Sequence, residues 1–437
     1  MSDEKTEPDS ATRVVLDAIQ RSDLGMVLVT LGLIYFVTTL LTFSDGLNSV
    51  VGLMRTLTFL GLVYALSALA LNLHWGYTGM FNIGVAGFMA IAVYTMGVVV
   101  RSPDPAFGPP GLGLPLPVGI VAGMAIAALV GLIAALPALR LRADYFAIVT
   151  LGISEIIRLT LQSSAVDGFL RETFAVGTGG GRGMGMPSNP VRELFLVGGQ
   201  AGEPTAVGNV VFGVLGESGL GISNNILIGW GYVAVLALFL VGVYVLLERL
   251  GRSPFGRNLK AIREDELVAD SLGKNVDLIK IKVFMIGCAL MGLAGILWFG
   301  SQGNVSPTPQ FMPLLTFYIF VAVIIGGSGS NTGAVLGGIT FAAVLFEGPR
   351  RVGAAVRGVI DAPTPPSFGD AVVSLDPVAF VAFATDNVAP LQFVLLGLVL
   401  ILIMHRRPEG LLGHRVETAA AVDLSDRPPE TGGEGDE

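Results

Sequence analysis

The chain has 437 residues, of which 52% are hydrophobic and only 14% are charged. A soluble domain of this length cannot bury so much apolar surface, so lipid must solvate part of the chain. The single cysteine, Cys288, excludes an intrachain disulfide and a thiolate metal cluster, and His74, His405 and His414 are too scattered to form a zinc site.

Acidic residues collect at the two ends of the sequence, and the net charge is −8. Residues 1–23 hold six carboxylates before the first apolar run, the opposite of a basic signal peptide, so we expect an uncleaved cytoplasmic segment. Residues 405–437 are predicted to form an acidic, disordered cytoplasmic tail. Five lysines against 21 arginines fit either a salt-adapted host or a GC-rich genome.

Ten apolar runs approach or reach the length needed to cross a hydrocarbon core about 30 Å thick. These runs are residues 24–43, 56–73, 80–100, 115–138, 144–162, 226–247, 281–300, 313–326, 333–347 and 388–404. We therefore predict an all-α polytopic membrane protein with about ten transmembrane helices. The eighth and ninth runs are short and joined by glycines, so a re-entrant pair is an alternative to two full crossings.

Loops rich in Arg and Lys stay on the cytoplasmic side, and three such loops fall on one face when ten crossings are counted. They contain Arg140 and Arg142; Arg249, Arg252, Arg257, Lys260 and Arg263; and His405, Arg406 and Arg407. Both termini are then cytoplasmic, in a multi-pass protein of the plasma membrane. Arg350, Arg351 and Arg357 break the pattern, but they lie in a loop of about 40 residues, where the rule weakens.

Five crossings before and five after a long loop are the numbers expected for an inverted repeat of five plus five helices. The first bundle is predicted at 24–163 and the second at 225–404, with extracytoplasmic inserts at 164–224 and 348–387. Long inserts of this kind are usually functional or disordered.

Each half also contains a glycine-interrupted stretch. The first half has Gly76, Tyr77, Gly79, Asn82 and Gly84, and the second half has Gly326, Gly327 and Gly329. Transporters usually place their central pathway at broken helices in corresponding halves, so both stretches are candidates for the substrate pathway. Close helix packing through small residues is the alternative.

Glu155 and Arg158 lie one helical turn apart in the fifth run, and therefore on one helix face. Ionisable groups at this depth are costly and normally face a bundle interior or an aqueous cavity. The two residues either line the substrate pathway or neutralise each other to fix helix packing, and the sequence leaves both interpretations open.

The loop 248–280, between the sixth and seventh runs, is charged but helical in pattern. Residues 258–272 are predicted to form one amphipathic helix, stopped by Gly273. Its apolar positions are Leu259, Ile262, Leu267, Val268 and Leu272. The acidic run 264–266 disfavours an anionic lipid surface, so we expect this helix to dock in a groove of a partner protein.

The stretch KAIREDELVADSLG (260–273) is similar to the ATPase-docking loop of ABC importer permeases, and the whole chain resembles the branched-chain amino acid permease family of the LivM type. Further stretches that carry the resemblance, in family order, are LNLHWGYTGMFNIGVAGFMAIAVYT (71–95), LRLRADYFAIVTLGISEIIRL (139–159), GLAGILWFGSQGNVSP (292–307), GGSGSNTGAVLGG (326–338) and RRPEGLLG (406–413). The resemblance implies that ATPase coupling involves Arg257, Lys260, Arg263, Glu264, Asp265, Glu266, Ala269 and Gly273.

The resemblance also implies a second permease subunit of the LivH type, two ABC ATPase subunits and an extracytoplasmic solute-binding protein, with membrane lipid around the helices and no nucleic acid. The sequence has no G-x-x-x-x-G-K-[ST] loop, so ATP and Mg²⁺ are expected on the partner ATPases, and this chain is expected to be non-catalytic and free of cofactors. The inserts would offer a landing surface to the binding protein, with a flexible spacer as the alternative for the first, because of its glycine-rich stretch 177–185.

The function implied is passage of branched-chain amino acids by alternating access, driven by ATP hydrolysis in a separate subunit. A permease for urea or short amides in the same family is an alternative. An ion-gradient-driven secondary transporter is a different class, and it would not need a motor-docking helix. An intramembrane enzyme would need a constellation such as H-E-x-x-H, which the sequence lacks.

Overall fold

The computed structural model describes residues 23–412 apart from 43–45, 106–107, 139–142, 188, 198–201, 217–218, 360–361 and 407–408. The predicted acidic ends therefore lie almost entirely outside the described residues, as do Arg140 and Arg142. Within the described part, helices account for nearly all regular structure, and the strands form only two short antiparallel pairs. The all-α polytopic membrane class is confirmed.

The long and apolar helices overlap all ten predicted runs. They are α2 (Asp23–Thr42), α3 (Leu47–Thr78), α4 (Val85–Val100), α5 (Leu116–Ala138), α6 (Ala143–Gln162), α10 (Asn224–Arg252), α13 (Val276–Phe299), α15 (Pro313–Gly326), α16 (Asn331–Thr340) and α20 (Val388–Arg406). Helices α3, α10 and α13 extend up to nine residues beyond their predicted runs. Seven helical segments of the described chain are long and apolar enough to cross a membrane. Shorter apolar helices stand at the predicted first, third and tenth crossings, so the count of ten is not established by length alone.

The connecting elements are short. The helices are α7 (Ser164–Phe174), η2 (Gly180–Arg182), α8 (Pro190–Phe195), α9 (Ala206–Val214), α11 (Pro254–Glu264), α12 (Glu266–Ser271), α14 (Pro307–Gln310), α17 (Gly348–Val359), α18 (Phe368–Val373) and α19 (Pro377–Asp386). Strand β1 (Met184–Gly185) pairs with β4 (Asn304–Val305), and β2 (Leu196–Val197) pairs with β3 (Glu203–Pro204). The first of these pairings holds the glycine-rich stretch 177–185 against the bundle, which argues against a free spacer.

Two further predicted boundaries are wrong, for local reasons. The run 80–100 becomes helical only at Val85, because Gly79 ends α3 in the left-handed region (φ +72°). The hydroxyl groups of Thr150 and Thr316 then accept hydrogen bonds from the backbone N–H groups of Ile83 and Ala86. The run 333–347 begins at Asn331 and continues through a π-helical segment, η3 (Phe341–Glu347), into α17, so part of the predicted insert 348–387 is helix.

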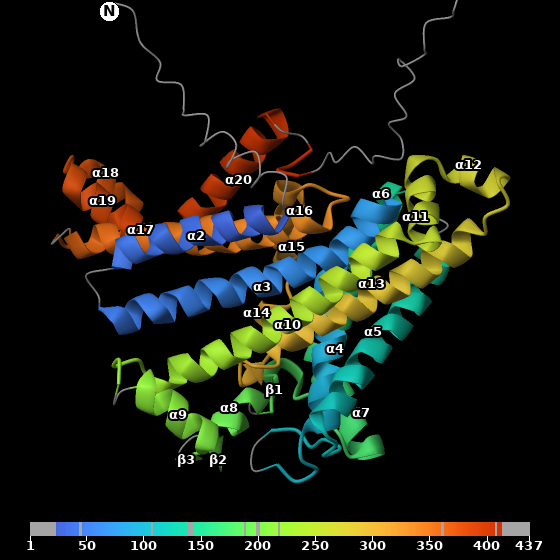
Figure 1. Cartoon of the computed structure of the whole chain (residues 1–437), viewed down its shortest axis with the longest axis horizontal. Coiled ribbons are helices and arrows are strands. Elements are labelled where there is room, and N and C mark those ends of the chain that lie inside the picture. Colours follow the sequence, from blue (N-terminus) through green and yellow to red (C-terminus); the bar gives the residue numbers. More distant parts are fainter. Residues whose placement is uncertain are drawn as a thin grey trace, which may run out of the picture.

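Helix α4 lies at the centre of the bundle and is almost completely buried, packed against α5, α6 and α13 (Figure 1). Small residues allow this close approach: a Cβ at Gly292 on α13 would lie 2.8 Å from the Cβ of Ala92. Helices in a membrane usually pack through such small residues, because the lipid is as apolar as the side chains and the hydrophobic effect does not drive the helices together.

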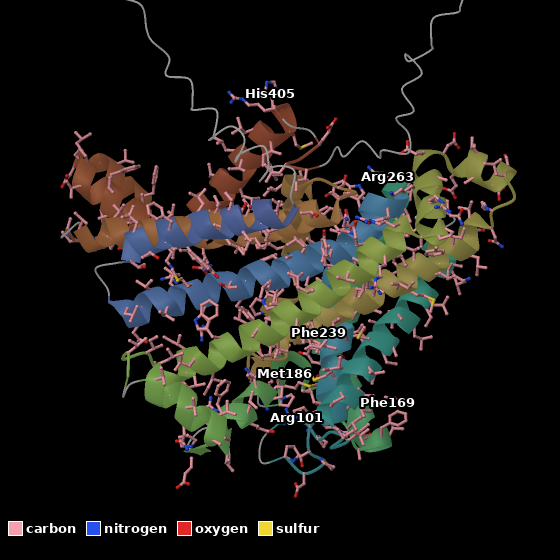
Figure 2. The ribbon with its side chains drawn as sticks, viewed as in Figure 1. Arg101, Phe169, Met186, Phe239, Arg263 and His405 are labelled. Carbon is pink, nitrogen blue, oxygen red and sulfur yellow. The ribbon has the colours of Figure 1, made fainter. Side chains whose placement is uncertain are left out.

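The bundle has two ends that differ in what they carry. Helices α11 and α12 lie at one end, called here the α12 end, and α7, α8 and α9 lie at the other, called the α9 end (Figure 1). Figure 2 shows Arg263 at the α12 end, far from Arg101 and Phe169. Helices α3 and α10 run between the ends, and the backbone N–H of Ser223 donates to Asn48 Oδ1 at the α9 end (3.0 Å).

Candidate functional site

The charged loop between α10 and α13 folds as two helices and not as the single amphipathic helix predicted at 258–272. Ser253 caps α11, with Pro254 in its first turn. Asp265 then leaves the helical region (φ −156°) and caps α12, because its Oδ1 accepts from the N–H groups of Leu267 (2.9 Å) and Val268 (3.1 Å). An Asp that satisfies two free N–H groups favours a new helix start over continuation of the old one. Gly273 (φ +76°) ends the segment, as expected.

The predicted apolar face is split by this break. Leu259 and Ile262 on α11 are buried against the bundle, whereas Leu267, Val268 and Leu272 are 79%, 55% and 73% exposed. Helix α12, with its C-cap Leu272, therefore presents three apolar side chains to its surroundings. Such an exposed group is typical of a surface that binds another protein.

Helix α12 is nevertheless held firmly on the bundle. Ala269 is buried in a small cluster with Ile262 and Val276, which joins α11, α12 and the start of α13. Glu266 accepts a hydrogen bond from Lys280 Nζ (2.5 Å), so an ion pair links α12 to α13. A force applied to α12 would therefore be passed to the membrane helices.

Arg263 connects this loop to the glycine-rich stretch of the first half. Its Nη1 donates to the carbonyl oxygen of Gly76, in the last turn of α3. A Cβ at Gly329 would lie 2.7 Å from the same Nη1, so the second glycine-rich stretch also meets this guanidinium. The carbonyl groups of a last helical turn lack helical partners, and a cation there is favoured by the helix dipole.

A buried polar cluster lies beneath Arg263 and joins α3, α10 and the α15–α16 turn. Asn331 Nδ2 donates to Tyr77 Oη (2.9 Å) and to Glu248 Oε2 (3.1 Å), while its Oδ1 accepts from Asn72 Nδ2 (3.3 Å). Asn72 Oδ1 in turn accepts from the N–H of Gly329 (2.8 Å). Networks of buried polar groups with satisfied partners fix one arrangement of the helices around them.

The segment after α20 completes this end of the bundle. The N–H groups of Leu411 and Leu412 donate to the carbonyl oxygens of Ile325 and Gly326, both at 2.9 Å. Gly410 (φ +78°) packs directly on Gly327, where a side chain would collide with backbone. Residues 410–412 of the RRPEGLLG stretch therefore pack beside the second glycine-rich stretch.

The predicted pathway residues fall into three places. Gly76, Tyr77, Gly79, Gly326, Gly327 and Gly329 come together at the α12 end. In this conformation they pack tightly, since a Cβ at Gly76 would lie 2.5 Å from the N–H nitrogen of Gly329. Asn82 and Gly84 lie deeper, at the start of α4, and Glu155 and Arg158 lie apart on α6.

Asn82 belongs to a second buried group that the sequence did not predict. The Phe284 carbonyl only accepts, so His74 Nε2 donates to it (3.2 Å), and His74 Nδ1 accepts from Asn82 Nδ2 (3.1 Å). The His74 ring stacks on Phe284 at 4.8 Å and occupies space left by Gly287, where a Cβ would overlap the imidazole. The sequence signal that could have found this group is the presence of two polar residues, Asn72 and His74, inside the apolar stretch LNLHW.

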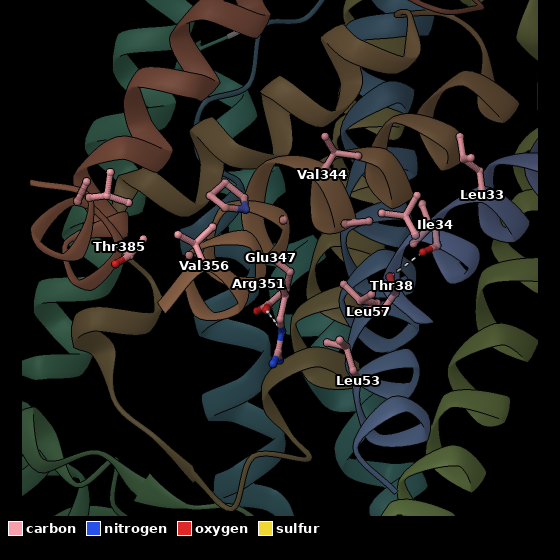
Figure 3. Close-up of a pocket in the computed structure, with 17 residues that line it drawn as sticks. Leu33, Ile34, Thr38, Leu53, Leu57, Val344, Glu347, Arg351, Val356 and Thr385 are labelled. Carbon is pink, nitrogen blue, oxygen red and sulfur yellow. Dashed lines mark hydrogen bonds and ion pairs between the residues drawn. The ribbon is translucent and has the colours of Figure 1, made fainter. Parts of the chain in front are cut away.

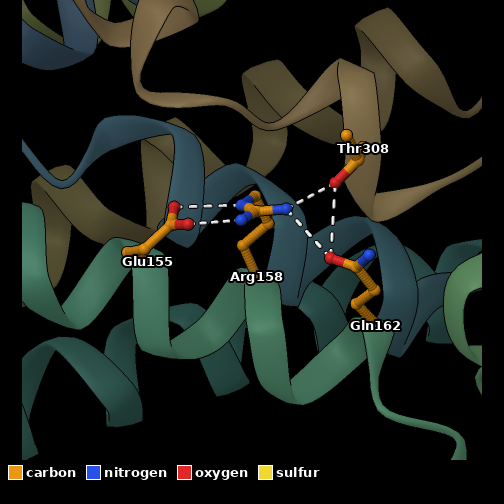
Figure 4. Close-up of polar contacts among 4 residues, drawn as sticks. All are labelled: Glu155, Arg158, Gln162 and Thr308. Carbon is orange, nitrogen blue, oxygen red and sulfur yellow. Dashed lines mark hydrogen bonds and ion pairs between the residues drawn. The ribbon is translucent and has the colours of Figure 1, made fainter.

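Glu155 and Arg158 share one face of α6, as predicted, and form an ion pair (Figure 4). Arg158 Nε donates to Glu155 Oε2 (2.9 Å), and Nη2 bonds the other carboxylate oxygen, so the pairing is bidentate. Arg158 Nη1 also reaches Gln162 Oε1 (3.0 Å) and the hydroxyl of Thr308, which ties α6 to α14. Arg158 is 13% exposed and Glu155 is 36% exposed.

An apolar cavity of about 560 Å³ lies between α2, α3, η3, α17 and α19 (Figure 3). Leu53, Leu57 and Val344 are among its walls, and its charged groups are already paired, with Arg351 Nε 3.5 Å from the buried Glu347. Its chemistry suits acyl chains more than a polar solute. Over the described residues, no three His, Cys, Asp or Glu side chains gather in a way that could hold a metal.

Comparison with known proteins gives a consistent result. A family described as branched-chain amino acid transport system / permease component matches residues 53–404. The chain is 32% identical over 283 residues to the high-affinity branched-chain amino acid transport system permease protein LivM of Escherichia coli, which covers 64% of this chain and 60% of that protein. No solved structure gave a significant match.

Two other relatives extend this picture. The probable branched-chain amino acid transport permease protein LivM of Methanocaldococcus jannaschii is 26% identical over 313 residues, covering 66% of this chain and 79% of that protein. The permease protein LivH of Escherichia coli is 33% identical over 107 residues, 24% of this chain and 32% of that protein. The chain thus aligns with about three fifths of the enterobacterial LivM proteins and with a smaller part of LivH.

Proposed function

Because the chain belongs to the branched-chain amino acid transport permease family, we propose that it is the membrane-spanning subunit of an ATP-driven importer and passes branched-chain amino acids by alternating access. ATP and Mg²⁺ would be bound by two separate ABC ATPase subunits, so this chain would have no catalytic role. A second permease subunit of the LivH type and an extracytoplasmic solute-binding protein would complete the assembly.

The exposed apolar side chains of α12 carry this proposal. Leu267, Val268 and Leu272 are exposed although α12 itself is anchored through Ala269. A cavity beside them is lined by three acidic residues and one lysine, namely Glu266, Asp270, Asp277 and Lys274, so its charged groups are mainly negative. A partner that fits this surface has an apolar groove with a basic rim, as expected for helix-in-groove docking.

Movement of the docked α12 would reach the substrate pathway through two links. The Glu266–Lys280 pair acts on α13, and the Arg263–Gly76 hydrogen bond acts on the end of α3. Both glycine-rich stretches meet at this point, so a shift of α11 would loosen or tighten their contact. Rigid helices that tilt about such a contact are a common form of alternating access.

This function needs the α12 end to face the cytoplasm, and we propose for the chain ten crossings, a five-plus-five repeat and both termini inside. The basic residues support that orientation, since α10 and α11 contribute Arg249, Arg252, Arg257, Lys260 and Arg263 at one end. The segment 409–412 packs at the same end. Arg350, Arg351 and Arg357, the exceptions, have acidic neighbours, Glu347 for the first two and Asp386 for the third.

The test is a double variant, Leu267→Ser with Leu272→Ser, assayed for ATPase association and for leucine uptake in the assembled system. Each leucine buried on docking contributes about 1.5–3 kcal/mol, so loss of both should weaken association by roughly 100-fold or more. Leu220→Ser removes an exposed leucine near the α9 end and serves as the matched control. Unchanged association of the double variant, or uptake driven by a salt or proton gradient alone, would contradict the proposed function.

A further inference from the structure

Arg55 is an ionisable residue in a membrane helix that the transport mechanism above does not use. It lies eight residues after the start of α3, about 12 Å along the axis at 1.5 Å per residue. Across the residues that the structure describes, no hydrogen bond or ion pair engages its guanidinium. Charged groups in membrane helices are costly and usually mark a polar cavity or a ligand.

Arg55 lines a cavity of about 240 Å³ between α3, α10 and the α9 end of the bundle. Asn189, the N-cap of α8, and Ser301, just after α13, also line this cavity. Gly229 on α10 leaves room for the arginine, since a Cβ there would lie 2.7 Å from Arg55 Nη1. The pocket is thus shaped around an extended guanidinium.

The other walls supply hydrogen-bond acceptors beside this donor. The hydroxyls of Thr56, Ser301 and Tyr232 donate to the carbonyl groups of Gly52 (3.0 Å), Trp298 (3.3 Å) and Leu297 (2.6 Å). A hydroxyl that has used its proton in this way still offers oxygen lone pairs. These lone pairs suit an ammonium group.

Phe59 and Val233 add apolar surface to the same cavity. A guanidinium, several hydroxyl acceptors and an apolar wall together complement a small zwitterion with an aliphatic side chain. The volume is below the roughly 300 Å³ at the lower end for drug-sized ligands, which fits a solute of this size.

We infer that this cavity, called here the Arg55 pocket, receives a zwitterionic aliphatic amino acid whose carboxylate pairs with Arg55. The inference rests on the proposed function for its place on the route, because the α9 end is extracytoplasmic only in the proposed orientation. The recognition itself depends on the pocket alone. A planar guanidinium binds a carboxylate through two parallel hydrogen bonds, which gives orientation as well as affinity.

The test measures binding to the purified full-length chain in lipid nanodiscs by titration calorimetry, with three probes: L-leucine, isocaproate, which lacks the ammonium group, and isoamylamine, which lacks the carboxylate. We expect leucine to bind best, isocaproate to bind more weakly, and isoamylamine to bind at least tenfold more weakly than leucine. Arg55→Gln should weaken leucine and isocaproate roughly 10- to 100-fold and leave isoamylamine unchanged.

Two further variants keep the result interpretable. Arg182→Gln removes an exposed arginine of the first insert and should leave all three affinities unchanged. Gly229→Ala keeps the arginine but displaces its side chain, so it should weaken leucine even if Arg55→Gln does not fold. Equal leucine affinity in wild type and Arg55→Gln overturns the inference, as does a phospholipid that native mass spectrometry finds bound to wild type and lost from Arg55→Gln.

Transport assays separate this inference from the proposed function. If the assembled importer takes up leucine with unchanged KM and kcat in Arg55→Gln, the proposed function stands and the Arg55 pocket is not on the route. If leucine binds at Arg55 but ATP drives no uptake, the pocket stands and the proposed function fails.

Discussion

The guanidinium of Arg263 donates a hydrogen bond to the carbonyl oxygen of Gly76, which joins the loop after α10 to the last turn of α3. The two residues are 187 positions apart in the chain. Because Gly76 also packs on Gly329, this one hydrogen bond reaches the point where both halves of the bundle meet. A contact at such a junction can bias which of two helix arrangements is more stable.

Arg263→Gln should uncouple ATP hydrolysis from transport. The variant should fold, because the side chain is exposed and glutamine retains much of its length. A hydrogen bond from a charged group contributes about 1.5–3 kcal/mol, so solute uptake per ATP hydrolysed should fall roughly tenfold. The measurement is paired ATPase and leucine-uptake rates in proteoliposomes of the assembled system.

Arg257→Gln is the matched comparison for that experiment. Arg257 lies on the same helix and is exposed, so in the proposed assembly it is available to the ATPase subunit. It should weaken ATPase association with little change in uptake per ATP. A coupling ratio in Arg263→Gln equal to that of wild type would rule out the proposed link through Gly76.

Asn331→Leu should destabilise the α12 end. The substitution removes one hydrogen-bond partner each of Asn72, Tyr77 and Glu248, and the first two of these side chains are buried. An unsatisfied buried group costs about 1–3 kcal/mol. The free energy of unfolding should fall by that amount, so the variant should unfold at a lower temperature. Asn209→Leu, at an exposed position on α9, should unfold like wild type in the same thermal assay. Equal midpoints for both variants would show that the network is not stabilising.

The helices could be predicted from sequence because lipid demands long apolar segments, and the bounds of α5, α6 and α15 differ from the predicted runs by at most one residue. The break at Asp265 could not be predicted in the same way, because a helical pattern continues through it and the capping geometry depends on local backbone. The Arg263–Gly76 contact is set by packing between distant segments. Hydropathy carries no information on such contacts, so the sequence predicted the two glycine-rich stretches without placing them beside the loop.

Gly287→Ala should destabilise the centre of the bundle. The new methyl group would overlap the His74 ring, which cannot move without losing its hydrogen bonds to Phe284 and Asn82. Overpacking of this kind costs about 1–3 kcal/mol. Gly242→Ala, where no atom lies within 4 Å of the added Cβ, should be close to neutral.

A double-mutant cycle assigns the Gly287 effect to the histidine. His74→Ala opens the space that the methyl group needs, so Gly287→Ala should cost less in that background than in wild type. Chemical denaturation in mixed micelles gives the four free energies. Costs that add without interaction would show that the methyl group clashes with something other than His74.

Glu155→Gln and Arg158→Gln should each lower stability, whereas the double neutral variant should recover most of the loss. Either single change leaves one charge on α6 beside the exposed apolar side chains of Ile156 and Leu159, and unpaired charge in such surroundings is costly. We expect each single variant to lose about 1–3 kcal/mol of stability, measured from the shift in thermal unfolding of the detergent-solubilised chain.

Uptake by the double variant then decides the role of the pair. If this variant folds and still imports leucine at the wild-type rate, the pair fixes the packing of α6 on α14. If it folds without uptake, the pair lines the pathway. Equal stability of all three variants and wild type would contradict the packing role, because a bidentate pair that also holds Thr308 would then contribute nothing to the fold.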